Sequence, residues 1–351
     1  MQTWVQTINR SPAQVLAIDV PTGLNPESGQ ALGNTTDAPC WVQAHHTLTF
    51  MAAKPGLFMG HGRDACGNIW LDRLGFGADE AAPPAQALLN PIHPRTPPSH
   101  ASHKGSHGDV AVIGGEPLTA HGMGMTGAAV LAATAALHVG AGRVILSLLS
   151  GQATDSAPPD LMQQDWRHLA LEKLHVVCGC GGGQTVHALL PEVLQRAAQL
   201  VLDADGLNAV ARDSHLPAWL RQRAHAQPTV ITPHPLEAAR LLNVSTAQVQ
   251  SHRLKAAQDL VDLFQCTVVL KGSGTVIAAP GQTPRINTTG NGRLAMGGTG
   301  DVLAGLIGAR MAQGLSAFEA ACSAVAQHGQ LANDWPEDQA LTASRLAQHL
   351  R

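Results

Sequence analysis

"GGTGDVLAGLIGARMAQG", residues 297–314, joins a glycine turn to an apolar helical run. Apolar residues recur every three to four positions after the turn, which is typical of a helix packed on one face, and Gly314 marks its expected end. The free N–H groups and the dipole of such a helix start favour an anion at 298–301. Asp301 lies in that first turn. The fragment alone supports two interpretations equally: a helix-start charge, or a general base beside bound phosphate.

Apolar runs that end in glycine or polar residues precede this stretch along the chain. We predict strands at 109–115, 143–149, 175–180, 200–205, 228–234 and 266–272. Helical patterns lie between them at 126–142, 185–198, 206–224, 236–242 and 246–264. Nearly continuous apolar strands indicate burial on both faces, as in parallel sheets. This block, placed at 103–351, therefore predicts an α/β sandwich with a mostly parallel central sheet.

A proline-rich segment separates this block from the start of the chain. Residues 82–100 hold six prolines and little periodicity, so we predict an extended linker over 79–102. The N-terminal piece, 1–78, contains strand-like runs at 15–19, 46–50 and 68–72, with barely a helical pattern. Three strands are too few to bury an independent core. We therefore expect this piece either to be part of something larger or to pack against the second block.

Composition narrows the class of protein. The 351 residues carry a net charge of −3 at pH 7 and only 13% of them are charged, which favours a folded chain without the basic surface of a nucleic-acid binder. No apolar run reaches 18 residues and no signal-peptide pattern opens the chain, so we expect no membrane span and a cytoplasmic location. Cys178 and Cys180 form a C-x-C, which we interpret as small residues at a buried strand end in preference to a metal site.

The predicted strands end in residues suited to binding, and ligands of open α/β sheets lie beyond the carboxyl ends of strands. The run KGSGT, Lys271 to Thr275, offers an ammonium group, two hydroxyls and unhindered N–H groups, a set suited to phosphate. The alternative is a tight hairpin turn, because the strand-like TVIAAP follows directly.

Three acidic residues and one histidine at strand ends each have two interpretations. Asp203 and Asp205 could hold Mg²⁺ through water or cap the next helix, and we favour the cap slightly. His234 lies between two prolines, either as a structural residue or as a ligand contact. Glu237 is as well explained as a first-turn helix charge.

With these residues in order, the second block resembles the ADP-dependent NAD(P)H-hydrate dehydratase family, a branch of the ribokinase-like superfamily. The matching motifs, in chain order, are HKGSHGDVAVIGG, GMTGAAVLAATAALHVGAGRV, PPDLM, LDADGLNAVA, TPHPLEAARLL, VVLKGSGTVIAAP and NTTGNGRLAMGGTGDVLAG. They span about 103–335, and an ordered series of this length is far more specific than any single glycine motif.

The resemblance implies a three-layer ribokinase-like sandwich and a reaction. Water would be removed from the S-epimer of hydrated NADH or NADPH, with ADP as the activating nucleotide and Mg²⁺ as its companion ion. It implies Asp301 as the catalytic acid/base. The residues implied for the ADP phosphates are Lys271, Gly272, Ser273, Gly274, Thr275 and Gly300, and those implied for the hydrated cofactor are Ala128, Gly181, Gly183, His234 and Asp301. Such proteins often assemble into tetramers, so we expect a homo-oligomer.

One departure from the family pattern lies in the substrate loop. The family usually shows G-P-G-L-G where this chain has GCGGG, so that Cys180 replaces proline and Gly182 replaces leucine. The backbone glycines are kept, but we expect this loop to be more flexible than the family's proline-containing loop.

The N-terminal piece resembles the last third of the NAD(P)H-hydrate epimerase domain, a Rossmann-like α/β fold, through VLAIDVPTGLNPESG, HTLTFMAAKPGL and GNIWLDRLGF. The resemblance implies that Asp19 would contact the hydrate and that Thr22 marks a K⁺ position, with K⁺ needed only in a complete site. The asparagine- and glycine-rich upstream segment has no counterpart, so we expect a truncated domain without epimerase activity.

Two other functions stay open at this point. A small-molecule kinase of the same fold, such as a hydroxyethylthiazole kinase, would share the G-x-G-D turn. A nucleotide-binding remnant without turnover is the second, suggested by the incomplete N-terminal domain.

Overall fold

The computed structural model describes residues 2–33, 40–76, 85–92 and 99–350. In this part of the chain the strands form one ten-stranded and one three-stranded sheet. No helix among the described residues is long and apolar enough to cross a membrane.

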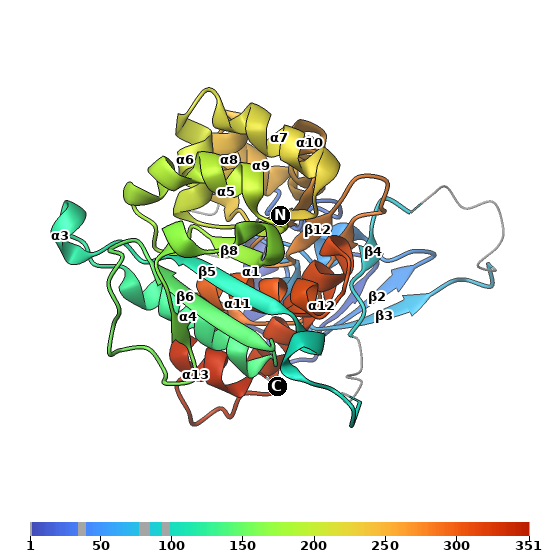
Figure 1. The fold of residues 1–351 in the computed structure, drawn as a ribbon. Coiled ribbons are helices and arrows are strands. Elements are labelled where there is room, and N and C mark those ends of the chain that lie inside the picture. The colour runs from blue at the N-terminus through green and yellow to red at the C-terminus, as the bar shows by residue number, and fades with distance from the viewer. Residues whose placement is uncertain (1, 34–39, 77–84, 93–98, 351) are drawn as a thin grey trace.

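The large sheet carries most of the fold (Figure 1). In spatial order its strands are β4 (Leu88–Leu89), β13 (Arg285–Ile286), β12 (Val276–Ala278), β11 (Thr267–Leu270), β10 (Thr229–Ile231), β9 (Gln199–Leu202), β8 (His175–Cys178), β5 (Asp109–Gly114), β6 (Arg143–Leu148) and β7 (Met162–Gln163). The strands from β11 to β7 pair in parallel, whereas β11, β12 and β13 pair antiparallel. The predicted mostly parallel sheet is confirmed.

Helices cover both faces of this sheet, which gives three layers. One face carries α4 (Thr126–His138), α11 (Thr299–Ala312), α12 (Ala317–Asn333) and α13 (Ala343–His349). The other carries α5 (Leu190–Arg196), α6 (Asp205–Arg212), α7 (Leu216–Ala226), α8 (Pro235–Leu242), α9 (Thr246–Ser251) and α10 (Arg253–Phe264). The short helix α3 (Leu118–His121) contributes no buried residue.

Strand β5 shows why the sequence builds two cores. Val110 and Val112 pack with the helices of the first face, while Ala111 and Ile113 pack with those of the second, because successive strand side chains point to opposite sides. All four are fully buried. Both faces of the strand are therefore apolar, as its continuous apolar run predicts.

Three predicted helices are interrupted in the structure. The segment 185–198 begins as a 3-10 turn, η5 (Thr185–Leu189), before α5. The segment 206–224 divides into α6 and α7, because Asp213 accepts a hydrogen bond from His215 N at 2.7 Å and Pro217 starts a new first turn. His252 lies between α9 and α10. Hydrophobic periodicity continues across these breaks and therefore does not reveal them.

The three strands predicted in the N-terminal piece are present as β1 (Leu16–Ile18), β2 (His46–Phe50) and β3 (Asn68–Asp72), and they form a parallel sheet. The piece also contains helices that the sequence analysis did not expect, α1 (Gln2–Arg10) and the single-turn α2 (Gly62–Ala65). Met59 is 1% exposed and packs into the core of the large domain. The piece does lean on the second block.

The proline-rich segment also joins the large domain. Its strand β4 pairs in parallel with β13 at the edge of the large sheet. The buried Asn90 then donates to Asn287 Oδ1 at 3.2 Å and to Cys322 O at 2.9 Å. The part of the linker that the structure describes is thus tied to the sheet.

Candidate active site

The carboxyl ends of the central strands lie together at one edge of the sheet. Gly115 N donates to Cys180 O at 3.0 Å, which links the ends of β5 and β8. Lys271 N donates to Pro233 O at 2.9 Å, which links the ends of β11 and β10. The sequence-predicted groups at these ends are therefore neighbours, as the parallel topology requires.

A buried ion pair forms the centre of the site. Lys271 Nζ lies 2.7 Å from Asp203 Oδ1, and Asp203 is 1% exposed. Thr232 Oγ1 donates to the same oxygen at 2.7 Å. Burial lowers the pKa of Lys271, but Asp203 and Glu237 more than offset this and the pKa is raised. Lys271 therefore carries its charge at neutral pH.

The slight preference for Asp203 and Asp205 as helix caps was wrong. The N-cap of α6 is Ala204, in a left-handed conformation with φ 50°, and no side chain caps the helix. Asp205 instead accepts a hydrogen bond from Gly183 N at 2.8 Å. Both aspartates therefore bond to residues at the other strand ends, and neither side chain caps α6.

Asp301 lies in the first turn of α11, which begins after Gly298 at φ 94°. Burial and the neighbouring Asp203 raise the pKa of Asp301 to about 6, although Lys271 and a hydrogen bond from Cys180 lower it. Both protonation states are therefore populated near neutral pH. This property separates Asp301 from an ordinary helix-start charge, which would be fully ionised.

Cys180 lies in the same cluster. One ligand atom each of Cys180, Asp203 and Asp301 lies within 4.8 Å of the others. Burial and both carboxylates raise the pKa of the Cys180 thiol well above its usual value, so the thiol stays protonated and donates to Asp301. Cys178 belongs to the opposite core. Both cysteines are fully buried at the end of β8, which fits the sequence interpretation of small residues at a buried strand end.

His234 and Glu237 form a capping box at the start of α8. The Nδ1 atom of His234 accepts from Leu236 N at 3.0 Å, while Glu237 Oε2 accepts from His234 N at 2.7 Å. Because Nδ1 accepts, the ring proton lies on Nε2, 3.4 Å from Glu237 Oε1. Burial raises the pKa of Glu237 to about 7. Glu237 is thus more than a helix charge, since it also fixes the orientation of His234.

The KGSGT run forms the turn of the β11–β12 hairpin. Arg253 on α10 donates hydrogen bonds to the backbone of this turn and of the strand before it. Arg253 is 2% exposed, and its Nη2 donates to Leu270 O at 3.0 Å, Lys271 O at 3.1 Å and Gly274 O at 3.3 Å. The sequence analysis missed Arg253, because nothing in its helical context distinguishes it from a surface arginine. A Cβ atom on Gly300 would lie 3.3 Å from Lys271 Nζ, so the turn and the start of α11 meet.

Ser273 differs from the rest of the turn in where its hydroxyl is directed. Ser273 Oγ donates to Gly60 O at 2.8 Å in the N-terminal piece, and Gly60 N donates to Ser273 O at 3.3 Å. This hydroxyl is used in a contact between the two parts of the chain. Of the groups predicted to bind phosphate, this leaves Lys271, the backbone N–H groups and Thr275.

The predicted substrate glycines form a loop against the start of α4. A Cβ atom on Gly181 would lie 2.8 Å from Ala128 Cβ and 2.6 Å from Met125 O, so only glycine fits. Gly181 and Gly183 have φ values of 57° and 54°, in the left-handed region. The structure thus places Gly181 against Ala128, and the binding of the hydrated cofactor by these residues stays a prediction.

The residues predicted for a remnant epimerase site lie elsewhere. Asp19, at φ 66°, follows β1 and accepts hydrogen bonds from Lys54 Nζ, Thr49 Oγ1 and Phe50 N. Lys54 lowers the pKa of Asp19. Thr22 is exposed. These residues lie beside the small sheet, and no hydrogen bond or ion pair among the described residues joins them to the strand-end site.

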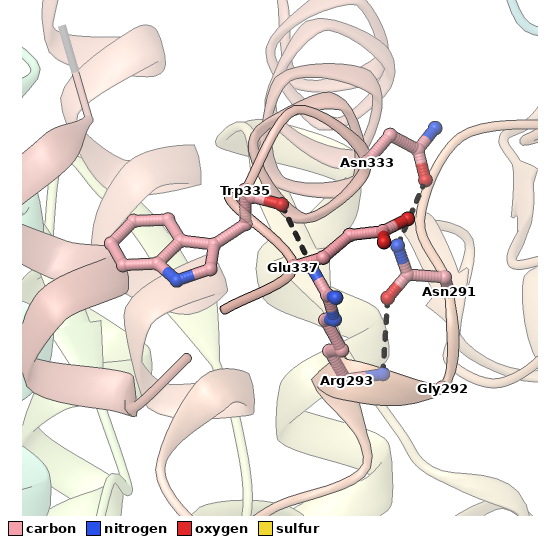
Figure 2. Close-up of a pocket in the computed structure, with 6 residues that line it drawn as sticks. All are labelled: Asn291, Gly292, Arg293, Asn333, Trp335 and Glu337. Atoms are coloured by element: carbon pink, nitrogen blue, oxygen red, sulfur yellow. Dashed lines mark hydrogen bonds between the residues drawn. The ribbon is translucent and has the colours of Figure 1, made fainter. Parts of the chain in front are cut away.

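Figure 2 shows a cavity of about 470 Å³ outside this group. It is lined by Asn291, Gly292, Arg293, Asn333, Trp335 and Glu337. Arg293 Nη1 donates to Trp335 O at 2.8 Å, and the Trp335 indole points away from the labelled polar groups. None of the sequence-predicted site residues lines this cavity.

The three layers and the strand-end site define a ribokinase-like α/β protein. The fold is shared with a solved ribokinase-like superfamily protein from Enterococcus faecalis V583, with a TM-score of 0.60 and 24% identity over 73% of this chain and 89% of that one. The chain belongs to the NAD(P)H-hydrate dehydratase family, whose family model matches residues 110–351. A second model, for the YjeF-related protein N-terminus, matches residues 1–56.

Individual relatives agree with this assignment. The chain is 38% identical to the bifunctional NAD(P)H-hydrate repair enzyme of Escherichia coli, covering 93% of this chain and 62% of that protein. It is also 38% identical to the ADP-dependent (S)-NAD(P)H-hydrate dehydratase of Neisseria meningitidis, covering 70% of this chain and 83% of that protein. The ADP/ATP-dependent NAD(P)H-hydrate dehydratase of Bacillus subtilis, co-crystallised with ATP and Mg²⁺, has a TM-score of 0.57 and 27% identity, over 72% of this chain and 90% of that chain.

Proposed function

We propose that this protein removes water from the S-epimer of hydrated NADH or NADPH and uses ADP as the activating nucleotide. The proposal depends mainly on the environment of Asp301. This carboxyl group lies at a helix start near Lys271, and its pKa is raised to about 6. The names of the Neisseria and Bacillus relatives support the substrate and the nucleotide.

Loss of water breaks a carbon–oxygen bond and a carbon–hydrogen bond on the adjacent carbon. A base accepts the carbon-bound proton, and an acid protonates the departing hydroxide. Asp301 can accept the first proton as a carboxylate and pass a proton to the hydroxide, so that protons balance over the cycle. Its raised pKa places both forms within reach at neutral pH.

Lys271 and the adjoining turn are suited to the nucleotide phosphates. The Lys271 charge lies beside the start of α11 at Gly300, and the N–H groups of Gly272 and Gly274 and the Thr275 hydroxyl follow Lys271 in the same turn. Ser273 would contribute its backbone, since its hydroxyl is bonded to Gly60 O.

Magnesium fits this edge through oxygen ligands. Mg²⁺ in nucleotide sites is held by substrate phosphates, one or two carboxylates and several waters. Asp203 and Asp205 supply carboxylates here, although one oxygen of Asp203 already accepts from Lys271. The ion would neutralise phosphate charge. Contact through water, as the sequence analysis suggests, suits this arrangement.

The hydrated cofactor would lie between the glycine loop and α8. Ala128, Gly181 and Gly183 offer a surface that a backbone or flat ring can approach closely, and His234 presents a ring fixed by its capping box. Burial and Lys271 lower the pKa of His234, so the ring is neutral at pH 7. Assembly into a tetramer, a K⁺ site at Thr22 and the absence of epimerase activity stay predictions.

The test is incubation of the purified chain with hydrated NADH and either ADP or ATP. NADH recovery with ADP supports the proposal. ATP consumption with a phosphorylated product would identify a kinase instead, and nucleotide binding without either reaction would identify a binding protein.

A further inference from the structure

Glu116 is a buried carboxylate directly after the glycines that end β5. It is 2% exposed and belongs to none of the groups assigned to nucleotide, substrate or proton transfer. Such burial is costly for a charged group unless hydrogen bonds compensate. Its contacts therefore indicate what the carboxylate does.

Oxygen Oε1 of Glu116 collects donors from the segment that follows the glycine loop. Gln184 N and Thr185 N each donate to it at 2.9 Å, and Thr185 Oγ1 donates at 2.7 Å. His121 Nδ1 lies 3.0 Å from the same oxygen. Burial raises the pKa of Glu116, but these hydrogen bonds outweigh it and the pKa is lowered, so the group is ionised at neutral pH.

The backbone of Glu116 ties the same loop to the start of α4. Glu116 N donates to Gly181 O at 2.7 Å, and Glu116 O accepts from Met125 N at 2.9 Å. One residue thus connects the end of β5, the glycine loop and the segment before α4. These are the elements that carry Ala128 and the two substrate glycines.

The carboxylate also occupies the space beside Gly183. A Cβ atom built on Gly183 would lie 2.2 Å from Glu116 Oε2, so the loop and the carboxylate interlock. Three glycines in succession, Gly181 to Gly183, have little stiffness of their own. Position 180 is cysteine in this chain, where the family usually has a proline that would stiffen the loop. Glu116 restrains the loop instead, through hydrogen bonds made from outside it.

We propose that Glu116 is a positioning residue that holds the loop 181–185 in the shape that receives the hydrated nicotinamide cofactor. This role rests on the proposed dehydration. The side chain of Glu116 bonds to His121, Gln184 and Thr185 and to no residue of the KGSGT turn in the described part of the chain, so it acts on cofactor binding and leaves ADP binding unchanged.

The test compares Glu116→Ala and Glu116→Gln with Asp213→Ala in the full chain. Asp213 accepts from His187 Nε2 at 2.7 Å and so ties η5 from its other end, which makes it a matched control. The measurements are KM and kcat with hydrated NADH, the Kd of ADP, and hydrogen–deuterium exchange across 181–186.

Loss of charge-assisted hydrogen bonds in Glu116→Ala should raise KM for the hydrate by about 10- to 100-fold. Exchange at Gln184 and Thr185 should accelerate, and the Kd of ADP should stay within about twofold. Glu116→Gln should fall between this variant and wild type, because its amide oxygen still accepts without charge. Asp213→Ala should leave KM and exchange at 184–185 unchanged.

Unchanged exchange at 184–185 in Glu116→Ala, or a lower melting temperature with wild-type KM, would overturn the proposal. An equal loss of ADP affinity would do the same, because it would show general disruption. If Glu116→Ala does not fold, Glu116→Gln gives the decision from the same readouts. A wild-type chain without dehydration would refute the proposed function, while exchange would still test the restraint on the loop.

Discussion

Asp301→Asn should stabilise the folded protein at neutral pH while it removes turnover. The pKa of Asp301 is raised to about 6, so the fold disfavours its charged form. Asparagine is similar in size, cannot ionise and still accepts the thiol hydrogen bond of Cys180. The substitution leaves Lys271 paired with Asp203. The variant therefore removes an unfavourable charge without breaking the central ion pair.

The magnitude follows from the shift between the ordinary pKa of 3.8 and about 6. One pKa unit corresponds to about 1.4 kcal/mol. Because Asp301 is only partly buried, solvent reduces the effect, and we expect a gain of about 2–3 kcal/mol in the free energy of unfolding. A folded-state pKa above the unfolded value favours the fold only while the group is protonated. The advantage of Asp301→Asn should therefore be near zero below about pH 4, grow between pH 4 and 6, and stay constant above.

Urea unfolding of wild type and variant at several pH values measures this difference. Asp203→Asn is the control with opposite sign, because it leaves the buried Lys271 without its partner and should destabilise by about 3–5 kcal/mol. Equal stability of Asp301→Asn and wild type at pH 7, or a gain that does not vary with pH, would refute the assigned environment of Asp301.

Three further predictions concern Asp301, its neighbour Cys180 and the phosphate turn. If Asp301 acts as a base, kcat/KM should rise with pH around a midpoint of about 6. Cys180→Ala should move that midpoint upward by about half a unit to one unit, because the thiol donor that lowers the Asp301 pKa is lost, whereas Cys178→Ala in the opposite core should not move it. Arg253→Met should weaken ADP binding by about 10-fold or more in calorimetry, because three carbonyl groups of the phosphate turn lose their common donor; unchanged affinity would show that the hairpin holds itself.

The fold was predictable because its strands are nearly continuous apolar runs and its glycines stand at their ends. Strand β5 illustrates this, since its apolar run and terminal glycines fix both its burial and its place in a parallel sheet. The breaks inside the predicted helices were not predictable from periodicity. They depend on local hydrogen bonds, such as that of Asp213 with His215 N.

The sequence predicted which candidate residues lie together at the strand ends, but not how their charges are arranged. Glycine turns and lone polar residues at strand ends identified Lys271, His234 and Asp301, because parallel topology places such ends at one edge. Glu116 and Arg253 gave no comparable signal. Their importance arises from burial and from backbone groups distant in sequence, which only the folded chain brings together.

The central claim is that Asp301 transfers the proton in an ADP-dependent loss of water. The most direct measurement is the ADP-dependent increase in NADH absorbance from hydrated NADH, compared between wild type and Asp301→Asn. We predict NADH recovery by the wild type and a rate lower by about 10²- to 10⁴-fold in the variant, with the Kd of ADP unchanged. Wild-type turnover in Asp301→Asn, or NADH recovery that does not depend on nucleotide, would contradict it.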